Sequence, residues 1–249
     1  ENNAYPNEHY IGVMDTPGQY TVQRWNNAGS RKESIEYKGS FNAWKMVTVV
    51  MAENSTTLYL DGQEAEVQTE EVMPLDGIIT ATSKFMIGKA NWEGGEYYTG
   101  LIDDFTIFDG ALSEAQVKAY YDETLVAEGD TQPKPLAVYD FENGLGEGVS
   151  QVVSGTKGST PAAYTGEAVF AEGRPAQDGQ AAGKAVKVGG PKNQKDGYGL
   201  KLNHTNLGTE YTASMWVRPD ENNKLPENMA VLFIGKHDPE KWVGVAGTE

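Results

Sequence analysis

Residues 98–113 read YTGLIDDFTIFDGALS, in which β-branched and aromatic residues stand between two glycines. This composition favours a β-strand, which we expect over residues 101–108. Ser113 and Gln116 follow with the spacing of a capping box, so a short helix is predicted within residues 112–121. We therefore expect a strand, a turn and a capped helix in this part of the chain.

Similar short runs recur along the chain and are separated by turns rich in Gly, Asp and Asn. The other predicted strands cover residues 19–25, 44–50, 56–60, 78–82, 84–87, 137–141, 184–188, 199–202, 211–217, 231–234 and 242–245. Asp61-Gly62 follows the third of these runs and is typical of a tight hairpin turn. Residues 144–180 are rich in Gly, Ser and Ala, and we expect long loops over a sheet edge there. Short strands joined by such turns indicate an antiparallel sandwich.

Several of these blocks occur in the order of a known domain. Residues 41–50 (FNAWKMVTVV), 58–62 (LYLDG), 86–88 (MIG) and 98–113 together resemble the closing half of a laminin-G-like, concanavalin A-like jelly-roll domain. The opening half of such a domain is similar to residues 137–144 (AVYDFENG), 183–188 (GKAVKV), 213–219 (ASMWVRP) and 232–236 (LFIGK). The resemblance implies an all-β, two-sheet antiparallel jelly roll with one short helix and its halves in reversed order.

The resemblance divides the chain into a closing half over residues 1–128, a linker over residues 129–136 and an opening half over residues 137–249. Residues 8–16 also match residues 240–248, with four identical positions, as if one strand occurred twice. Two interpretations remain open: parts of two tandem domains, or halves that complement each other. We favour complementation, within one chain or in a domain-swapped dimer, because each half alone would expose unpaired strand edges.

Acidic residues in two of these blocks are candidate metal ligands. Asp103 and Asp104 are adjacent in a predicted strand and should point to opposite faces, whereas Asp140 and Glu142 should share one face. The resemblance implies a structural calcium where the first and last strands meet, with Asp140 or Glu142 beside Asp103 or Asp104. Asn143 would be a further oxygen donor. The alternative is that these residues cap loops or pair with Lys and Arg.

Exposed aromatic residues are the candidate ligand contacts. The Gly-rich loop from Asn91 to Tyr98 carries Trp92, Tyr97 and Tyr98 beside polar residues, and Trp25 stands in a similar polar context. A ring in such a loop can stack on the C–H face of a sugar while polar neighbours bind its hydroxyls. The alternative is that these rings cover the ends of the sandwich.

Two further tryptophans, Trp44 and Trp216, lie in apolar strand runs, and we expect both in the core.

Composition excludes several classes of function. The 249 residues include 36 acidic and 20 basic ones, a formal charge of −16, which disfavours nucleic-acid binding. Without cysteine there is no disulfide, no thiolate nucleophile and no Cys-ligated zinc. The sequence has no run of 18 apolar residues and therefore predicts no membrane-spanning helix. Residues 1–6 do not resemble a signal peptide. We find no paired-carboxylate run of the kind that jelly-roll glycosidases use.

These observations predict a non-catalytic carbohydrate-binding module of a larger secreted or cell-surface glycan-active protein, such as an accessory module of a glycoside hydrolase. Its partner would be a polysaccharide or another glycan. The alternatives are an adhesion or protein-recognition domain and a structural spacer. An extracellular location would require an export signal outside this sequence.

Overall fold

The structure is a computed structural model, and it describes residues 9–16, 19–26, 29–36, 43–53, 55–65, 84–89, 98–123, 133–146, 149–154, 162–163, 168–175, 182–189, 198–203, 210–220 and 229–236. The strands in the first part are β1 (His9–Thr16), β2 (Gln19–Asn26), β3 (Gly29–Glu36), β4 (Lys45–Ala52), β5 (Ser55–Leu60), β6 (Gln63–Glu64), β7 (Lys84–Ile87) and β8 (Gly100–Asp109). The helix α1 (Glu114–Tyr121) follows. The remaining strands are β9 (Lys134–Tyr139), β10 (Val149–Ser154), β11 (Ala162–Ala163), β12 (Val169–Glu172), β13 (Lys184–Val188), β14 (Tyr198–Leu202), β15 (Tyr211–Pro219) and β16 (Met229–Lys236).

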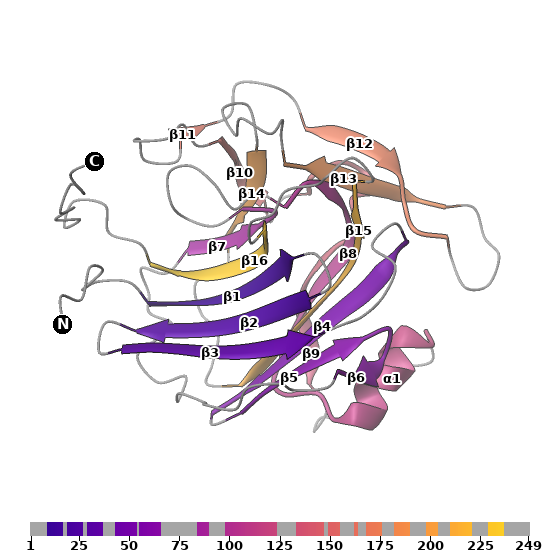
Figure 1. The fold of residues 1–249 in the computed structure, drawn as a ribbon. Coiled ribbons are helices and arrows are strands. Elements are labelled where there is room, and N and C mark those ends of the chain that lie inside the picture. The colour runs from indigo at the N-terminus through magenta and orange to yellow at the C-terminus, as the bar shows by residue number, and fades with distance from the viewer. Residues whose placement is uncertain are drawn as a thin grey trace, which may run out of the picture.

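These strands form two antiparallel sheets (Figure 1). The first sheet has the order β11-β10-β14-β7-β16-β1-β2-β3, and the second has the order β12-β13-β8-β15-β4-β5-β6, with β9 also paired to β8. The predicted all-β, two-sheet antiparallel fold with one short helix is thus confirmed. Within the described residues, no helix has the length and apolar character needed to cross a membrane.

Strands from both parts of the chain are neighbours in both sheets. In the second sheet β15 pairs with β8 on one side and with β4 on the other. In the first sheet β16 lies between β7 and β1. Each part therefore supplies hydrogen-bonding partners to the other. The reversed order of the halves relative to the family stays a prediction.

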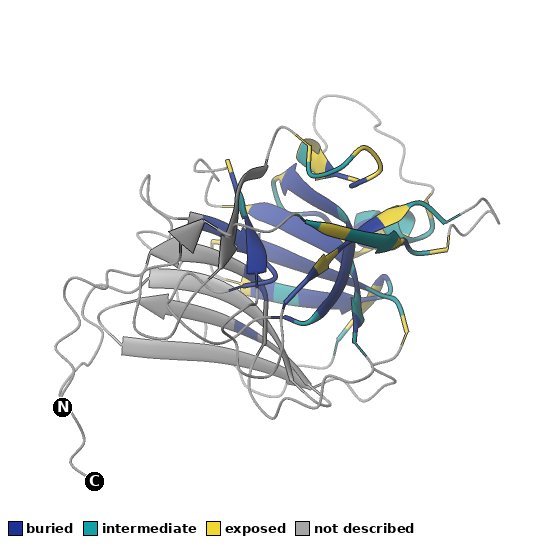
Figure 2. Cartoon of the chain, turned by 90° about the horizontal axis from the view of Figure 1, so that it is seen from above, coloured by how far each residue is buried: buried dark blue, intermediate teal, exposed yellow. Residues whose placement is uncertain are grey.

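The main core lies between the two sheets (Figure 2). Phe105 of β8 is fully buried there, with its ring centroid 6.4 Å from Phe85 of β7 and 5.7 Å from Tyr139 of β9. Since β7 belongs to the first sheet and β8 to the second, this aromatic group joins the two layers.

A β-bulge interrupts β8. Ser214 of β15 pairs with Thr106, but Trp216 pairs with Asp103, so β8 carries an extra residue at this point. Ile102 before the bulge and Phe105 after it both lie in the inter-sheet core. The side chains of β8 that face the core are therefore even-numbered before the bulge and odd-numbered after it.

The helix covers a second, smaller apolar cluster on the outer face of the second sheet. This cluster consists of Val50, Tyr59, Phe108, Leu112 and Val117. The predicted capping box is confirmed: the Gln116 N–H donates to Ser113 Oγ at 3.4 Å, and the Ser113 N–H donates to Gln116 Oε1 at 2.8 Å. The cap fixes where the helix begins.

Replacing Ser113 with alanine should lower the free energy of unfolding by about 1 kcal/mol, because the Gln116 N–H loses its acceptor. Urea denaturation monitored by circular dichroism measures this change. Ser113→Asp, which keeps an acceptor oxygen, is the control and should unfold close to the parent. Equal midpoints for the alanine and parent proteins would contradict this role of the cap.

The hairpin between β5 and β6 contains the predicted Asp61-Gly62 turn, and both residues have positive φ angles, 51° and 75°. A Cβ atom at Gly62 would lie only 2.8 Å from the Cβ of Tyr121 in α1. Glycine at this position therefore permits both the turn and the close approach of the helix.

Some expectations for secondary structure were wrong. Residues 144–180 include β10, β11 and β12 rather than loops alone, because β10 pairs with β14 and β12 with β13. The polar strand β3 pairs with β2 and was not predicted. The strands expected at residues 78–82 and 242–245 lie outside the described residues.

Candidate binding site

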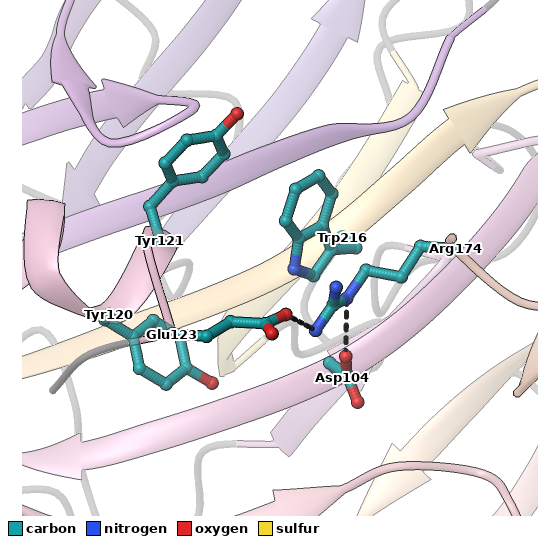
Figure 3. Close-up of a pocket in the computed structure, with 6 residues that line it drawn as sticks. All are labelled: Asp104, Tyr120, Tyr121, Glu123, Arg174 and Trp216. Carbon is teal, nitrogen blue, oxygen red and sulfur yellow. Dashed lines mark hydrogen bonds and ion pairs between the residues drawn. The ribbon is translucent and has the colours of Figure 1, made fainter. Parts of the chain in front are cut away.

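A cavity of about 240 Å³ opens on the outer face of the second sheet, beside the C-terminal end of α1 (Figure 3). It is lined by Asp104, Tyr120, Tyr121, Glu123, Arg174 and Trp216. We call this cavity the outer pocket.

Several elements contribute to the outer pocket. Trp216 alternates along β15 with the core residues Met215 and Val217, so its ring points away from the core. Tyr120 and Tyr121 end α1, and Glu123 follows with a positive φ of 57°.

Arg174, after β12, is the centre of the polar contacts. Its Nε donates to Asp104 Oδ2 at 2.7 Å, and its Nη2 lies 2.7 Å from Glu123 Oε1. Its Cζ lies 4.8 Å from the ring centroid of Trp216, a cation–π distance. Burial lowers the pKa of Arg174, but the hydrogen bonds and charges of Asp104 and Glu123 outweigh burial, and the net shift is upward. The guanidinium is therefore a fixed positive charge between two carboxylates.

The aromatic side of the pocket is also fixed by contacts. Tyr121 stacks on Trp216, with ring centroids 5.7 Å apart and 27° between the planes. The Tyr120 hydroxyl bonds Thr106 Oγ1 at 2.9 Å, and its ring meets Phe108 edge-on. Burial raises the pKa of Tyr120, so its hydroxyl stays protonated at neutral pH.

The bulge in β8 brings both adjacent aspartates to Arg174. Asp104 binds the side chain, while Asp103 Oδ2 accepts the backbone N–H of Arg174 at 3.0 Å. The expectation that these carboxylates point to opposite faces was therefore wrong, because the extra residue interrupts the regular alternation. Asp103 is only 3% exposed, and burial raises its pKa to about 6.

The candidate calcium ligands have protein partners in the described part of the chain. Asp140 Oδ1 accepts the N–H of Glu142 at 3.2 Å, and Glu142 Oε1 accepts the N–H of Lys184 at 2.8 Å. Asn143 is exposed. Together with the Asp104–Arg174 pair, these contacts match the alternative of loop capping and pairing with Lys and Arg. No group of three or more His, Asp or Glu residues in the described ranges could hold a metal ion, and the calcium site stays a prediction.

The predicted sugar contacts have different outcomes. Asn91, Trp92 and Tyr97 lie outside the described residues. Trp25 lies on β2, where its backbone pairs with Tyr10 and Ser30 in the first sheet.

Tyr98 is fully buried in the main core, so the expectation that it stacks on a sugar is not supported.

Trp216 was expected in the core and instead lines the outer pocket. The alternating pattern of β15 could have placed it there, because residues 212, 214, 216 and 218 are Thr, Ser, Trp and Arg, whereas residues 211, 213, 215 and 217 are buried in the core. Arg174 and Glu123 carry no comparable local signal.

The outer pocket thus combines aromatic surface with a fixed cation and two carboxylates. Such a mixture suits the recognition of a small ligand that has both apolar and hydrogen-bonding surfaces.

Comparison with known proteins finds a family similarity for the first part of the chain. A laminin-G family model, described as the concanavalin A-like lectin/glucanases superfamily, matches residues 2–118. No curated protein matches the chain significantly. The match agrees with the two-sheet antiparallel sandwich and with the resemblance of residues 41–113. Residues 2–118 are therefore similar to a laminin-G-like domain of the concanavalin A-like lectin/glucanases superfamily.

Proposed function

We propose that this domain is a non-catalytic carbohydrate-binding module and that the outer pocket holds part of a glycan. The observation that carries the proposal is the placement of Trp216 and Tyr121 beside Arg174, Asp104 and Glu123 in one cavity. Aromatic rings offer apolar contact to the C–H groups of a sugar, while the charged groups can bind its hydroxyls. The parent protein would be a larger secreted or cell-surface protein that acts on glycans.

The charges favour particular ligands. Arg174 is already paired with two carboxylates, so the pocket carries an excess of one negative charge. A neutral or cationic glycan fits this balance better than an acidic one, because like charges repel. Even weak binding at such a site would be useful if the module is linked to a glycoside hydrolase. The bound module would then keep the linked enzyme at a high effective concentration near its substrate.

The test is a glycan array followed by affinity electrophoresis with the ligands that bind. We expect Trp216→Ala to weaken binding by about tenfold, because losing an aromatic contact worth about 1.4 kcal/mol corresponds to that factor.

Trp44→Ala is the matched control. Trp44 is also half-buried and lies 5.4 Å from the guanidinium of Arg218, and it does not line the outer pocket. We expect this variant to bind like the parent.

The possible outcomes test the position of the site and the proposed function separately. Binding that survives Trp216→Ala but not Trp92→Ala or Trp25→Ala would move the site to residues 91–98 or to β2. A parent protein that binds no glycan on the array would contradict the function itself.

Recognition of a protein is the second candidate, and exposed apolar side chains favour it. Leu136 and Val138 on β9 are 46% and 58% exposed. Substitutions in the outer pocket would leave binding through this surface unchanged, which distinguishes the two functions.

A further inference from the structure

The outer pocket has more acidic than basic side chains. Its charged lining residues are two carboxylates, Asp104 and Glu123, and one guanidinium, Arg174. A third acidic residue, Asp103, lies beside them and accepts the backbone N–H of Arg174 at 3.0 Å. The charges at this place therefore do not cancel, and an occupant with a positive charge would be attracted by the excess.

Each carboxylate of the pocket uses only one of its oxygens to bind Arg174. Asp104 accepts from Nε through Oδ2, and Glu123 pairs with Nη2 through Oε1 (Figure 3). Within the part of the chain that the structure describes, Asp104 Oδ1 and Glu123 Oε2 make no hydrogen bond. The two side chains are 32% and 37% exposed. Two acceptor oxygens that solvent can reach are thus left for a ligand.

The end of α1 adds to the negative potential of the pocket. Tyr120 and Tyr121 are the last two residues of α1, and both line the pocket. The carbonyl groups at the C-terminal end of a helix carry a partial negative charge, which favours a cation near the last turn. Burial is the main cause of the raised pKa of Tyr120, and the charges of Asp104 and Glu123 raise this pKa further. The Tyr120 hydroxyl therefore lies in the field of the same two carboxylates.

The size of the outer pocket suits one sugar unit. A cavity of about 150 Å³ can hold a benzene ring. The outer pocket, at about 240 Å³, has room for a six-membered sugar ring with its substituents. Tyr121 and Trp216 supply apolar walls for such a ring. The pocket thus offers apolar surface and acidic groups to the same small ligand.

We propose that the outer pocket recognises an amino sugar, and that Asp104 and Glu123 bind its protonated amino group. This ligand class rests on the glycan-binding function proposed above. An ammonium group has three N–H donors and a charge, whereas a sugar hydroxyl has one donor and no charge. Hydrogen bonds from a cation to a carboxylate are stronger than those from a neutral donor. The carboxylates then lie between two cations, Arg174 on one side and the ligand on the other.

Paired sugars test whether the amino group is recognised. The probes are the methyl glycosides of glucosamine and glucose, of galactosamine and galactose, and of N-acetylglucosamine, at pH 6.5, where an amine is mostly protonated. NMR titration of the full chain gives the dissociation constants. We expect at least one amino sugar to bind about fivefold more tightly than its hydroxyl counterpart. Acetylation of glucosamine should remove any gain, because it removes the charge. Amino sugars that bind no more tightly than their counterparts in both pairs would overturn the proposal.

A matched pair of variants separates the pocket from general attraction of cations to an acidic protein. Glu123→Gln and Asp122→Asn each remove one carboxylate from neighbouring positions. The Asp122 side chain is 39% exposed, pairs with Lys118 at 2.5 Å and does not line the pocket. We expect Glu123→Gln to lose most of the preference for the amino sugar while its affinity for the neutral sugar stays the same. Asp122→Asn should keep the preference, and equal losses in the two variants would overturn the proposal.

Two further outcomes distinguish this inference from the function on which it rests. Neutral sugars that bind as tightly as amino sugars, with binding lost in Trp216→Ala, would overturn the inference and leave the glycan-binding function standing. A chain that binds none of the sugars in the titration or on the glycan array would overturn both. Methylammonium chloride supplies a cation without a sugar ring. If it competes as strongly as the amino sugar, a lysine side chain of a protein would serve equally well, and the proposed ligand class would be wrong.

Discussion

Replacing Phe105 with alanine is expected to lower the free energy of unfolding by about 4 kcal/mol. The ring is fully buried and contacts Phe85 across the two sheets and Tyr139 within the second sheet. Its removal leaves a cavity bordered by strands that pair on both sides, so the surroundings can collapse only in part. Guanidinium denaturation followed by intrinsic fluorescence measures the loss.

Two variants show whether position matters as well as size. Phe105→Leu keeps most of the apolar volume and should cost less than half as much. Phe170→Ala removes the same ring from a partly buried position on β12, near the edge of the sheet, and should also cost less. A Phe105→Ala protein that unfolds at the parent midpoint would mean that this ring does not join the layers.

Lowering the pH from 7 to 5 is expected to add a stabilising contribution from Asp103. Burial raises the pKa of this carboxyl from 3.8 to about 6 in the folded chain. Below pH 3.8 the group is neutral in both states and costs nothing, whereas above pH 6 it is charged in both and its burial is unfavourable. The contribution is therefore present at low pH and is lost as the pH rises through about 6, with a total of up to about 3 kcal/mol.

The measurement is the free energy of unfolding between pH 4.5 and 7.5, compared among three proteins. In Asp103→Asn the pH-dependent contribution of this side chain to the free energy of unfolding should disappear. The difference in the free energy of unfolding between the Asn variant and the parent should therefore change with pH. Asp109→Asn removes an exposed carboxylate from the same strand and should keep the pH profile of the parent. Parallel profiles for Asp103→Asn and the parent would contradict the raised pKa.

Elements with strong local signals were predictable from the sequence. The bounds of β7 and β13 agree with the predicted strands, and the capping box of α1 is formed by the predicted residues. A hairpin turn or a helix cap is specified by adjacent residues, so no distant partner is needed to recognise it. The strands β3 and β10 had no such signal, because they depend on pairing with β2 and β14.

The outer pocket was less predictable than the fold. Trp216 and Asp104 were noted in the sequence, but Tyr120, Tyr121, Glu123 and Arg174 were not named as site residues. Arg174 and Asp104 are far apart in the sequence and meet only because the segment after β12 lies beside β8. The residues of this pocket are brought together by the order of strands in the sheet. They therefore show no regular spacing along the sequence.

The bulge in β8 has a consequence for insertions and deletions. Ile102 and Phe105 both face the core because one extra residue resets the alternation between them. Deleting a single residue here would put the two halves of the strand back in phase, and either Ile102 or the pair Phe105 and Ile107 would then turn toward the outer face. Point substitutions at Asp104 leave this phase unchanged. Single-residue length changes near Asp103 and Asp104 should therefore be far more damaging than replacing Asp104 with asparagine.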